Sequence, residues 1–290
     1  MTRVSIVIPC FNGGDMVRDA IASAIGQTHE DVEIIVVNDG STDAATLAAL
    51  ERADRFDGLR VINQENRGLP LALNRGIHES SGAYVIPLAH DDEFYPTYVA
   101  KAAALLDDRS EVGIVYCRAE RFGASVGEWE LLDFDMGRML VDNLIFACAM
   151  YRRQDWEAVG GYSKSMSRGF EDHDFWLKLL TLGREVERID EVLFRYRDTY
   201  GSLSNTMVTS DRIAAFSAIF SANADLYVRH AREFAEVMIG QQEMLRHFKQ
   251  RYGRIEDQIA RLGELRRKLQ RRPRSVGISL VGRRSGSRFQ

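Results

Sequence analysis

The chain has 290 residues, of which 45% are hydrophobic and 28% charged, and its formal net charge is −4. This size and hydrophobic content suffice for one large α/β domain with an extension. Three cysteines, odd in number and far apart, argue against a disulfide framework or a cysteine-based metal site and favour a reducing compartment. The sequence shows no signal-peptide pattern and no apolar run as long as a membrane span, so we expect a cytoplasmic protein.

Four apolar runs dominate the first hundred residues. They lie at 4–8, 32–37, 59–63 and 83–88. Their apolar residues hardly alternate with polar ones, which is typical of strands covered on both faces. The helical spacing of apolar residues between them predicts helices at 15–25, at 42–53 and up to about residue 80. Strands and helices that alternate through short turns predict a parallel sheet with right-handed crossovers.

Polar residues follow each of these strands. They are Phe11-Asn12-Gly13, Asn38-Asp39-Gly40, Asn66-Arg67-Gly68 and His90-Asp91-Asp92. In a parallel sheet such segments meet at one edge, where open α/β sheets bind ligands. The chain has neither Gly-x-Gly-x-x-Gly after its first strand nor a P-loop, so neither a dinucleotide-binding Rossmann domain nor a P-loop NTPase is expected.

Asp91 and Asp92 are adjacent acids at the end of a buried strand. Because two neighbouring carboxylates repel each other, ionising both is costly unless water or a cation compensates, and a divalent metal would do so. The alternative is that the two acids begin the next helix, where they would suit the positive end of its dipole. Asp39 also has two explanations, a contact with a nucleobase or ribose and a role as a turn residue.

In the second half of the chain, apolar runs predict strands at 112–118 and 193–197, and a further apolar segment lies at 145–152. The long connection at 121–142 holds Trp129 and is typical of a substrate-facing loop or an inserted hairpin. Glu171, Asp172 and Asp174 stand at the start of a predicted helix, and interaction with the helix dipole is their ordinary explanation.

Helical spacing continues from about residue 211 to 272, and Pro273 ends it. A short heptad-like seam is formed by Ile255, Ile259, Leu262, Leu265 and Leu269. From residue 246 on, about fourteen Lys and Arg stand against three acids, roughly +11, which leaves roughly −15 on the remainder. A solvated helix face is the ordinary explanation, and contact with anionic lipids is an alternative. Nucleic acid is not an expected partner, because no aromatic residues are interleaved with the basic ones.

Six short motifs follow one another along the chain. They are Val-Ser-Ile-Val-Ile-Pro-Cys-Phe-Asn at 4–12, Gln27-Thr28, Asn-Asp-Gly-Ser-Thr-Asp at 38–43, Asn66-Arg67-Gly68, Asn74-Arg75-Gly76, and Leu-Ala-His-Asp-Asp at 88–92 with Pro96. In this order they resemble the inverting family 2 glycosyltransferases of the GT-A fold, over roughly residues 3–204. The resemblance implies an α/β fold with a Rossmann-like, mostly parallel central sheet flanked by helices, here with an α-helical C-terminal extension.

The resemblance also implies roles for individual residues. A nucleotide-sugar donor would contact Pro9, Phe11, Asn12, Asp39, Asn66, Gly68, Asn74, Asp92, Arg197 and Ser202. Asp91 would hold a divalent metal, Mg²⁺ or Mn²⁺, on the diphosphate, and Asp172 would be the catalytic base. Glu171 and Trp176 are the acceptor-side candidates, although a helix tryptophan is more commonly a core residue.

Two positions depart from the family pattern. Ala89 stands where the first acid of the family's Asp-x-Asp motif commonly contacts the ribose, and Thr199 stands where many relatives have a metal-ligating histidine. We therefore expect a weak dependence on the metal. The departures also leave an alternative function, that of a catalytically weak or inactive GT-A-like protein that binds nucleotides or acts as a scaffold.

The expected function is transfer of a single sugar, with inversion, to a hydroxyl of a glycan or lipid-linked acceptor in cell-surface polysaccharide or glycolipid synthesis. No Gln-x-x-Arg-Trp motif and no membrane span are present, which argues against a processive synthase. We expect a catalytic domain at 1–205, with its donor half at 1–110 and its acceptor half at 111–205, then a helical extension at 206–272 and a disordered basic tail at 273–290. The basic helix predicts peripheral contact with the inner face of the membrane, and the seam predicts a homodimer.

Overall fold

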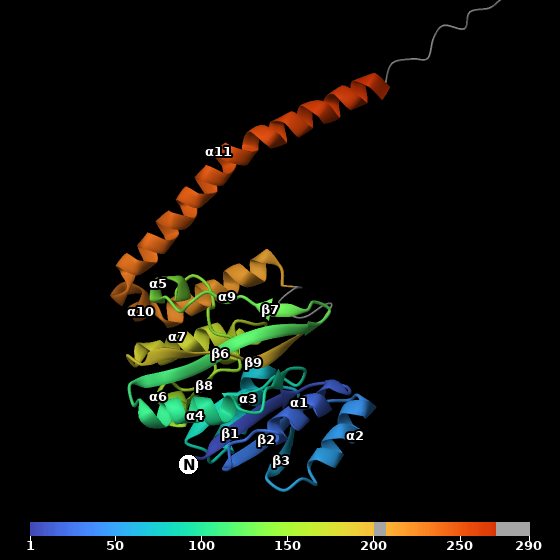
Figure 1. The fold of residues 1–290 in the computed structure, drawn as a ribbon, viewed down its shortest axis with the longest axis vertical. Coiled ribbons are helices and arrows are strands. Elements are labelled where there is room, and N and C mark those ends of the chain that lie inside the picture. Colours follow the sequence, from blue (N-terminus) through green and yellow to red (C-terminus); the bar gives the residue numbers. More distant parts are fainter. Residues whose placement is uncertain (200–206, 271–290) are drawn as a thin grey trace, which may run out of the picture. The chain divides into compact units, whose positions relative to one another are not determined.

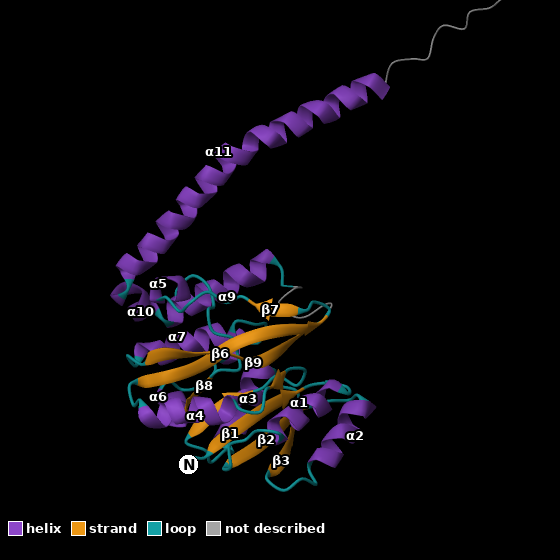
Figure 2. Ribbon diagram, in the orientation of Figure 1, coloured by secondary structure: helices purple, strands orange, loops and turns teal. Residues whose placement is uncertain are grey.

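The computed structural model describes residues 1–199 and 207–270, which Figures 1 and 2 show as ribbons. Ser202 and the predicted tail at 273–290 lie outside these residues. The chain divides into two compact units, Met1–Val237 and a second unit that begins at Met238. Among the described residues, no helix combines the length and the apolar character needed to cross a membrane.

The first unit contains all the described strands. They are β1 (Val4–Cys10), β2 (Val32–Asp39), β3 (Leu59–Gln64), β4 (Tyr84–Pro87), β5 (Glu93–Phe94), β6 (Val112–Gly123), β7 (Gly127–Trp129), β8 (Met150–Arg152) and β9 (Glu185–Asp198). The helices are α1 (Met16–Ile25), α2 (Ala44–Ala53), α3 (Leu69–His78), α4 (Tyr98–Asp108), α5 (Met136–Met139), α6 (Arg153–Ala158), α7 (Glu171–Thr181), α9 (Thr209–Ala222), α10 (Ala224–Arg229) and α11 (Ala231–Gln270), with a 3₁₀ turn at Lys164–Met166. Helix α11 crosses the boundary between the two units.

The strands form one sheet in the order β3-β2-β1-β4-β8-β6-β9-β5, with β7 paired to β6. The first four strands of this order are parallel, as predicted, and Val4 lies opposite both Val32 and Tyr84. The short β8 pairs antiparallel with β4 and with β6, and so joins the two halves of the sheet. The expected α/β fold with a central sheet flanked by helices is confirmed.

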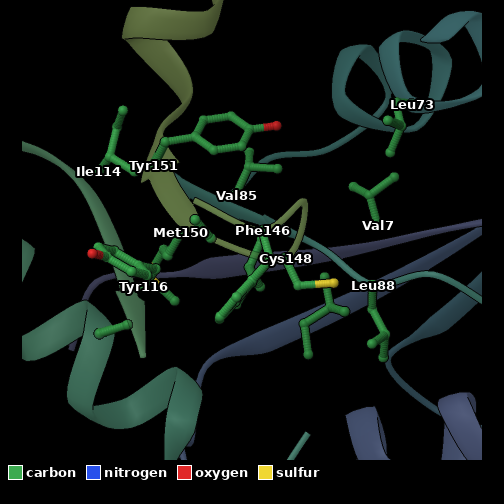
Figure 3. Packing of buried hydrophobic residues seen from close by; sticks show 14 of the residues in the cluster. Val7, Leu73, Val85, Leu88, Ile114, Tyr116, Phe146, Cys148, Met150 and Tyr151 are labelled. Carbon is green, nitrogen blue, oxygen red and sulfur yellow. The ribbon is translucent and has the colours of Figure 1, made fainter. Parts of the chain in front are cut away.

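One large hydrophobic core connects the two halves of the chain. Figure 3 shows members of this core from both halves: Val7, Leu73, Val85, Phe146, Cys148 and Tyr151. Every residue of β1 is buried, as expected for an apolar strand covered on both faces. Gly76 lets α3 approach the sheet closely, because a Cβ at this position would collide with the side chains of Val7 and Val37. The shared core therefore fixes the turns that follow the strands.

Helices α9 and α10 pack on the α/β body. Ile219 and Leu226 are completely buried, and the hydroxyl of Tyr227 donates to the carbonyl oxygen of Leu140 over 2.9 Å. The side-chain amide of Asn223, buried between the two helices, donates to Asp174 of α7. The helices that precede Met238 thus belong to the same compact unit as the sheet.

The second half of the chain differs from its sequence prediction in extent. β6 continues to Gly123, and β9 begins at Glu185 rather than at residue 193. Residues 185–191 read Glu-Val-Glu-Arg-Ile-Asp-Glu, and these charged residues hide the apolar pattern of a strand. Arg109 balances the negative charge of Glu185 and Glu187 by forming an ion pair with each. The stretch at 121–142 contains β7 and α5, and only β8 is a strand within 145–152.

Candidate active site

A cavity of about 660 Å³ lies at the C-terminal ends of β1, β2 and β4. Its wall contains predicted site residues from both halves of the chain: Pro9, Phe11, Asp39, Asp91, Asp92, Glu171 and Asp172. The structure therefore brings the donor-side and acceptor-side acids into one site. The other described candidates are outside this wall: Asn12, Asn66, Gly68, Asn74, Trp176 and Arg197.

Asn12 joins the turn after β1 to the turn after β2. Its backbone is left-handed, with φ 51°, a conformation that Asn tolerates better than most residues. Its side-chain oxygen accepts hydrogen bonds from the N–H groups of Thr42 and Asp43, at 2.8 and 3.0 Å. Its own N–H donates to the hydroxyl of Ser41. Asn12 therefore fixes the turn that carries Phe11 into the cavity wall.

Asp39 organises the loop after β3. Its carboxylate, only 3% exposed, accepts three hydrogen bonds of 2.7–2.9 Å, from the side chain of Gln64 and from the N–H groups of Arg67 and Gly68. Asn66 of the same loop lies so close to Gly40 that a Cβ there would collide with its backbone nitrogen. The turn role expected for Asp39 is therefore present in the structure, and the same residue also lines the cavity.

Asn74 connects α3 to the segment that follows α6. Its side-chain oxygen accepts from the N–H of Tyr162 and from the indole N–H of Trp156, and its NH₂ group donates to the carbonyl oxygen of Tyr162. Gly161 lies against this amide, with a positive φ of 71°. The contacts that the structure gives Asn74 are all to this segment, which leads toward α7.

Asp91 and Asp92 occupy different environments in the same turn. Asp92 is buried, and its Oδ1 accepts the N–H of Arg197 over 2.8 Å; burial and the neighbouring charge of Asp91 raise the pKa of Asp92 well above its ordinary value. The half-buried carboxylate of Asp91 lines the cavity without a hydrogen-bond or ion-pair partner among the described residues. The alternative that these acids begin a helix is wrong, because β5 follows them and α4 begins only at Tyr98.

The donor set at this turn suits a metal that is shared with a substrate. No group of three or more His, Cys, Asp or Glu side chains is arranged to hold a metal within the described part of the chain. Mg²⁺ commonly binds through one or two carboxylates plus water and substrate phosphates, so the unpartnered carboxylate of Asp91 fits this pattern. Thr199, at the position of the family's histidine, also lines the cavity.

The acids at the start of α7 divide into two groups. Asp174 is completely buried and is bonded to the hydroxyl of Ser163 and to Lys178, so it is a structural residue. Glu171 and Asp172 face the cavity instead. They follow Phe170, whose φ of 64° is unusual for a large residue and marks a strained turn into the helix.

Asp172 is held by two hydrogen bonds. Its Oδ2 accepts the side-chain NH₂ of Asn143 over 2.8 Å, and its Oδ1 accepts the N–H of His173 over 2.7 Å. Burial raises the pKa of Asp172, whereas these two donors lower it. Burial, followed by the charge of Asp172, raises the pKa of Glu171. The pair can therefore retain one proton at neutral pH, which suits acid–base chemistry.

The structure corrects one acceptor-side candidate and adds others. Trp176 is completely buried, and its indole N–H donates to the carbonyl oxygen of Ile145, so no sugar ring can stack on it. Trp129 of β7 and Tyr196 of β9 instead line the cavity, with ring centroids 5.0 Å apart. Asn143 was not predicted, because it lies between elements without periodicity and nothing in the sequence points to Asp172 as its partner.

Comparison with known proteins identifies the family. Residues 5–171 match the model of Glycosyl transferase family 2, so the chain belongs to this family and is a glycosyltransferase. It is 32% identical over 232 residues to the uncharacterized glycosyltransferase RT0329 of Rickettsia typhi, covering 75% of this chain and 70% of that protein. It is 36% identical over 135 residues to the uncharacterized glycosyltransferase YibD of Escherichia coli, covering 46% of this chain and 39% of YibD.

Solved structures show the same fold. S. aureus TarS 1–349 in complex with UDP-GlcNAc has a TM-score of 0.64 at 17% identity, over 79% of this chain and 72% of that one. The mannosyltransferase PcManGT from Pyrobaculum calidifontis, in complex with GDP-Man and Mn²⁺, has a TM-score of 0.56 at 17% identity, over 84% and 81%. The GT-A fold implied by the sequence motifs is therefore confirmed.

Proposed function

We propose that this glycosyltransferase transfers a single sugar, with inversion, from a nucleotide-diphospho-sugar to an acceptor hydroxyl, with Asp172 as the general base. One observation carries the proposal: Asp91 and Asp172 line the same cavity from opposite halves of the chain. Asp91 belongs to the turn after β4, at the edge where α/β sheets bind ligands, and Asp172 belongs to the first turn of α7.

The proposed chemistry is one in-line displacement. The acceptor oxygen forms a bond to C1 of the sugar while the bond from C1 to the diphosphate oxygen breaks, and the acceptor proton passes to the carboxylate of Asp172. Attack and departure on opposite faces of C1 invert its configuration. The hydrogen bonds from Asn143 and His173 favour the ionised form of this carboxylate and so oppose the effect of burial.

The donor half of the wall supports a nucleotide ligand. Pro9, Phe11 and Asp39 line it, next to Asp91. TarS with UDP-GlcNAc and PcManGT with GDP-Man and Mn²⁺ share the fold, which supports a nucleotide-sugar donor and a divalent metal here. Bound at Asp91, Mg²⁺ or Mn²⁺ would neutralise charge on the diphosphate. Arg197 holds the turn of Asp91 through its side chain, which donates to the carbonyl oxygen of Asp91 over 2.8 Å.

The acceptor half of the wall is mostly apolar and aromatic. Trp129, Leu131 and Tyr196 line it beside Glu171. Aromatic rings pack well against the apolar faces of sugars and against lipid groups. We therefore propose that the acceptor is a glycan or a lipid-linked group. The enzyme then acts in cell-surface polysaccharide or glycolipid synthesis, in the cytoplasm at the inner face of the membrane.

We propose helix α11 as the surface that contacts a second copy of the chain or the membrane. In its second-unit part, Leu245 and Phe248 are each 61% exposed and Tyr252 is 40% exposed, at spacings of three and four residues. This spacing suits pairing with a second copy of the chain, and the neighbouring Arg246 and Lys249 suit anionic lipid headgroups. The structure does not describe the side chains of four residues of the predicted seam, Ile255, Ile259, Leu265 and Leu269.

The two partners of α11 can be separated by experiment. Light scattering should give a dimer that Phe248→Glu dissociates if the helix pairs with a second copy. Flotation with anionic but not neutral vesicles should occur if the helix binds lipid. A monomer that floats with neither kind of vesicle would exclude both partners.

The enzymatic proposal is tested with a panel of UDP-, GDP- and dTDP-sugars, with and without Mn²⁺. Thermal shift and donor hydrolysis should select one donor in the wild type. Asp172→Asn should bind this donor but hydrolyse it about 100-fold or more slowly, as expected for loss of a general base. Asp91→Asn should lose the Mn²⁺-dependent part of binding, and exposed Asp57→Asn is the matched control. Absence of binding to every nucleotide would refute the proposal and favour the scaffold alternative.

A further inference from the structure

Asn143 lies in the connection between α5 and β8, and its amide is held in one orientation. Its side-chain oxygen accepts the N–H of Ile145 over 3.2 Å, and its own N–H donates to the side chain of Asp142 over 2.9 Å. A backbone N–H can only donate, so the side-chain oxygen of Asn143 must face Ile145. The NH₂ group is then directed at Oδ2 of Asp172, 2.8 Å away.

The two acids of the pair have different hydrogen-bond partners. Each acid accepts from its own backbone N–H, and Asp172 accepts in addition from Asn143 and from the N–H of His173, donors that Glu171 lacks among the described residues. Glu171 is also 9% exposed, so its charged form would have little contact with water. Because donors directed at a carboxylate stabilise its ionised form, ionisation is more favourable at Asp172 than at Glu171.

We propose that Asn143 is a positioning residue that selects Asp172 as the ionised member of the pair and leaves the proton on Glu171. This inference rests on the proposed function of Asp172 as the base. Asn143 acts without a charge of its own, so it orients the carboxylate without the strong loss of basicity that a neighbouring Lys or Arg would cause.

Apart from Asn143, the side chains around Asp172 make no hydrogen bond to its carboxylate within the described part of the chain. The ring of His173 also lowers the pKa of Asp172, but it makes no hydrogen bond to that carboxylate, and its Nε2 pairs with the carbonyl oxygen of Met139 over 2.7 Å. The buried hydroxyl of Tyr162, from the segment after α6, is near both acids and does not hydrogen-bond to either. Arg212 of α9 lines the same cavity, and among the described residues no ion pair joins it to Asp172. Among the described residues, Asn143 is therefore the side chain that hydrogen-bonds to one carboxylate of the pair and not to the other, and the backbone N–H of His173 favours the same member.

The test measures the titration of Asp172 directly and then compares it with activity. The full chain, labelled with ¹³C at the aspartate carboxyl carbons, is titrated by NMR, and the Asp172 signal is assigned by its loss in Asp172→Asn. Removing the amide in Asn143→Ala should raise the titration midpoint of Asp172 by about one pH unit, a tenfold change in its protonation equilibrium. Asn143→Asp keeps the shape but adds a third acid, so it should raise the midpoint further.

Kinetics provide the second readout. The acidic limb of kcat/KM for donor hydrolysis should move to higher pH in Asn143→Ala by the same amount, while the donor KM stays within about twofold. Deletion of an exposed amide in Gln154→Ala is the matched control and should change neither quantity. If Asn143→Ala does not fold, as judged by its melting temperature, Asn143→Leu, which has a similar shape but no donor, is titrated in its place.

The outcomes separate this inference from the function on which it rests. An Asp172 midpoint that is the same in the wild type and in folded Asn143 variants would overturn the role of Asn143, whatever the activity. If the midpoint shifts but the wild type hydrolyses no donor, the proposed function is overturned. Asn143 would then still favour ionisation of Asp172, but this effect would have no role in catalysis. Matching shifts of the midpoint and of the acidic limb would support both.

Discussion

The backbone N–H of Arg197 donates to the buried carboxylate of Asp92 over 2.8 Å, so β9 holds the turn that follows β4. The side chain of Arg197 strengthens this connection. Its Nε donates to the carbonyl oxygen of Asp91, and its guanidinium also pairs with Asp19 and Glu93. The position of the Asp91 carboxylate, in the first half of the chain, thus depends on a residue of the second half.

Arg197→Ala should weaken both stability and donor binding. The substitution keeps the backbone bond to Asp92 but removes the bonds to Asp91, Asp19 and Glu93, and we expect a loss of about 1–3 kcal/mol in the free energy of unfolding. Urea denaturation and the donor-induced thermal shift measure the two effects. Arg55→Ala removes an exposed pair with Glu51 and should cost less than about 1 kcal/mol. Equal losses for the two variants would contradict this role of Arg197.

Asp39→Asn should destabilise the loop after β3. The native carboxylate accepts from the N–H groups of Arg67 and Gly68 and from Gln64, whereas an amide must direct its NH₂ group at one of these donors. Leaving such buried groups unpaired costs about 1–3 kcal/mol each, so the urea midpoint should fall and donor affinity should fall with it. A variant as stable as exposed Asp57→Asn would show that the loop does not depend on this carboxylate.

Asn74→Ala separates structural from donor-binding roles. The amide bridges Trp156 and both backbone groups of Tyr162, so its removal should cost roughly 2–4 kcal/mol of stability. Because Asn74 is outside the cavity wall, the donor KM of the folded variant should stay within about twofold of the wild type. A large rise in KM at unchanged stability would instead support the direct donor contact expected from the sequence.

Glu171→Gln should change how stability depends on pH. Burial and the charge of Asp172 raise the pKa of Glu171 to about 8, above the value of about 4.3 in an unfolded chain. The folded state therefore binds this proton more tightly, and the contribution of Glu171 to stability, present below about pH 4, is lost as the pH rises toward 8.

The glutamine variant lacks this titration. Its advantage in unfolding free energy over the wild type should grow between pH 5 and pH 8, by an amount on the order of 1–4 kcal/mol. Urea denaturation at four pH values measures the difference. Exposed Glu51→Gln is the control and should show no such trend. A constant difference across this range would mean that Glu171 is ionised throughout.

Local patterns were sufficient to predict the donor half of the fold. The apolar runs gave the parallel strands, and the polar turns after them gave one shared edge with Asp39 and Asp91. The position of Asp172 could be assigned only through the resemblance to the family, because acids at a helix start have an ordinary structural explanation. Its entry into the cavity wall depends on the strained backbone of Phe170, which no local pattern indicates.

Contacts between distant segments could not be predicted in the same way. Asn74 meets Tyr162 from 88 residues away, and Arg197 meets Asp91 from 106 residues away. Trp129 of the short β7 and Asn143 lie in a stretch with little periodicity, so nothing in the sequence indicated a partner for either residue. These residues owe their roles to tertiary packing, which single-sequence periodicity does not encode.

The pairing of β5 with β9 limits how this enzyme can be recombined with its relatives. β5 lies in the first half of the sequence but pairs with β9 of the second half, with Glu93 opposite Arg195 and Phe94 opposite Phe194. A chimera joined at residue 110 would separate these partners and place an unmatched strand beside the turn of Asp91. Exchange of the segment between β6 and β8 leaves the pair intact, so that segment can vary while the turn of Asp91 keeps its support from β9.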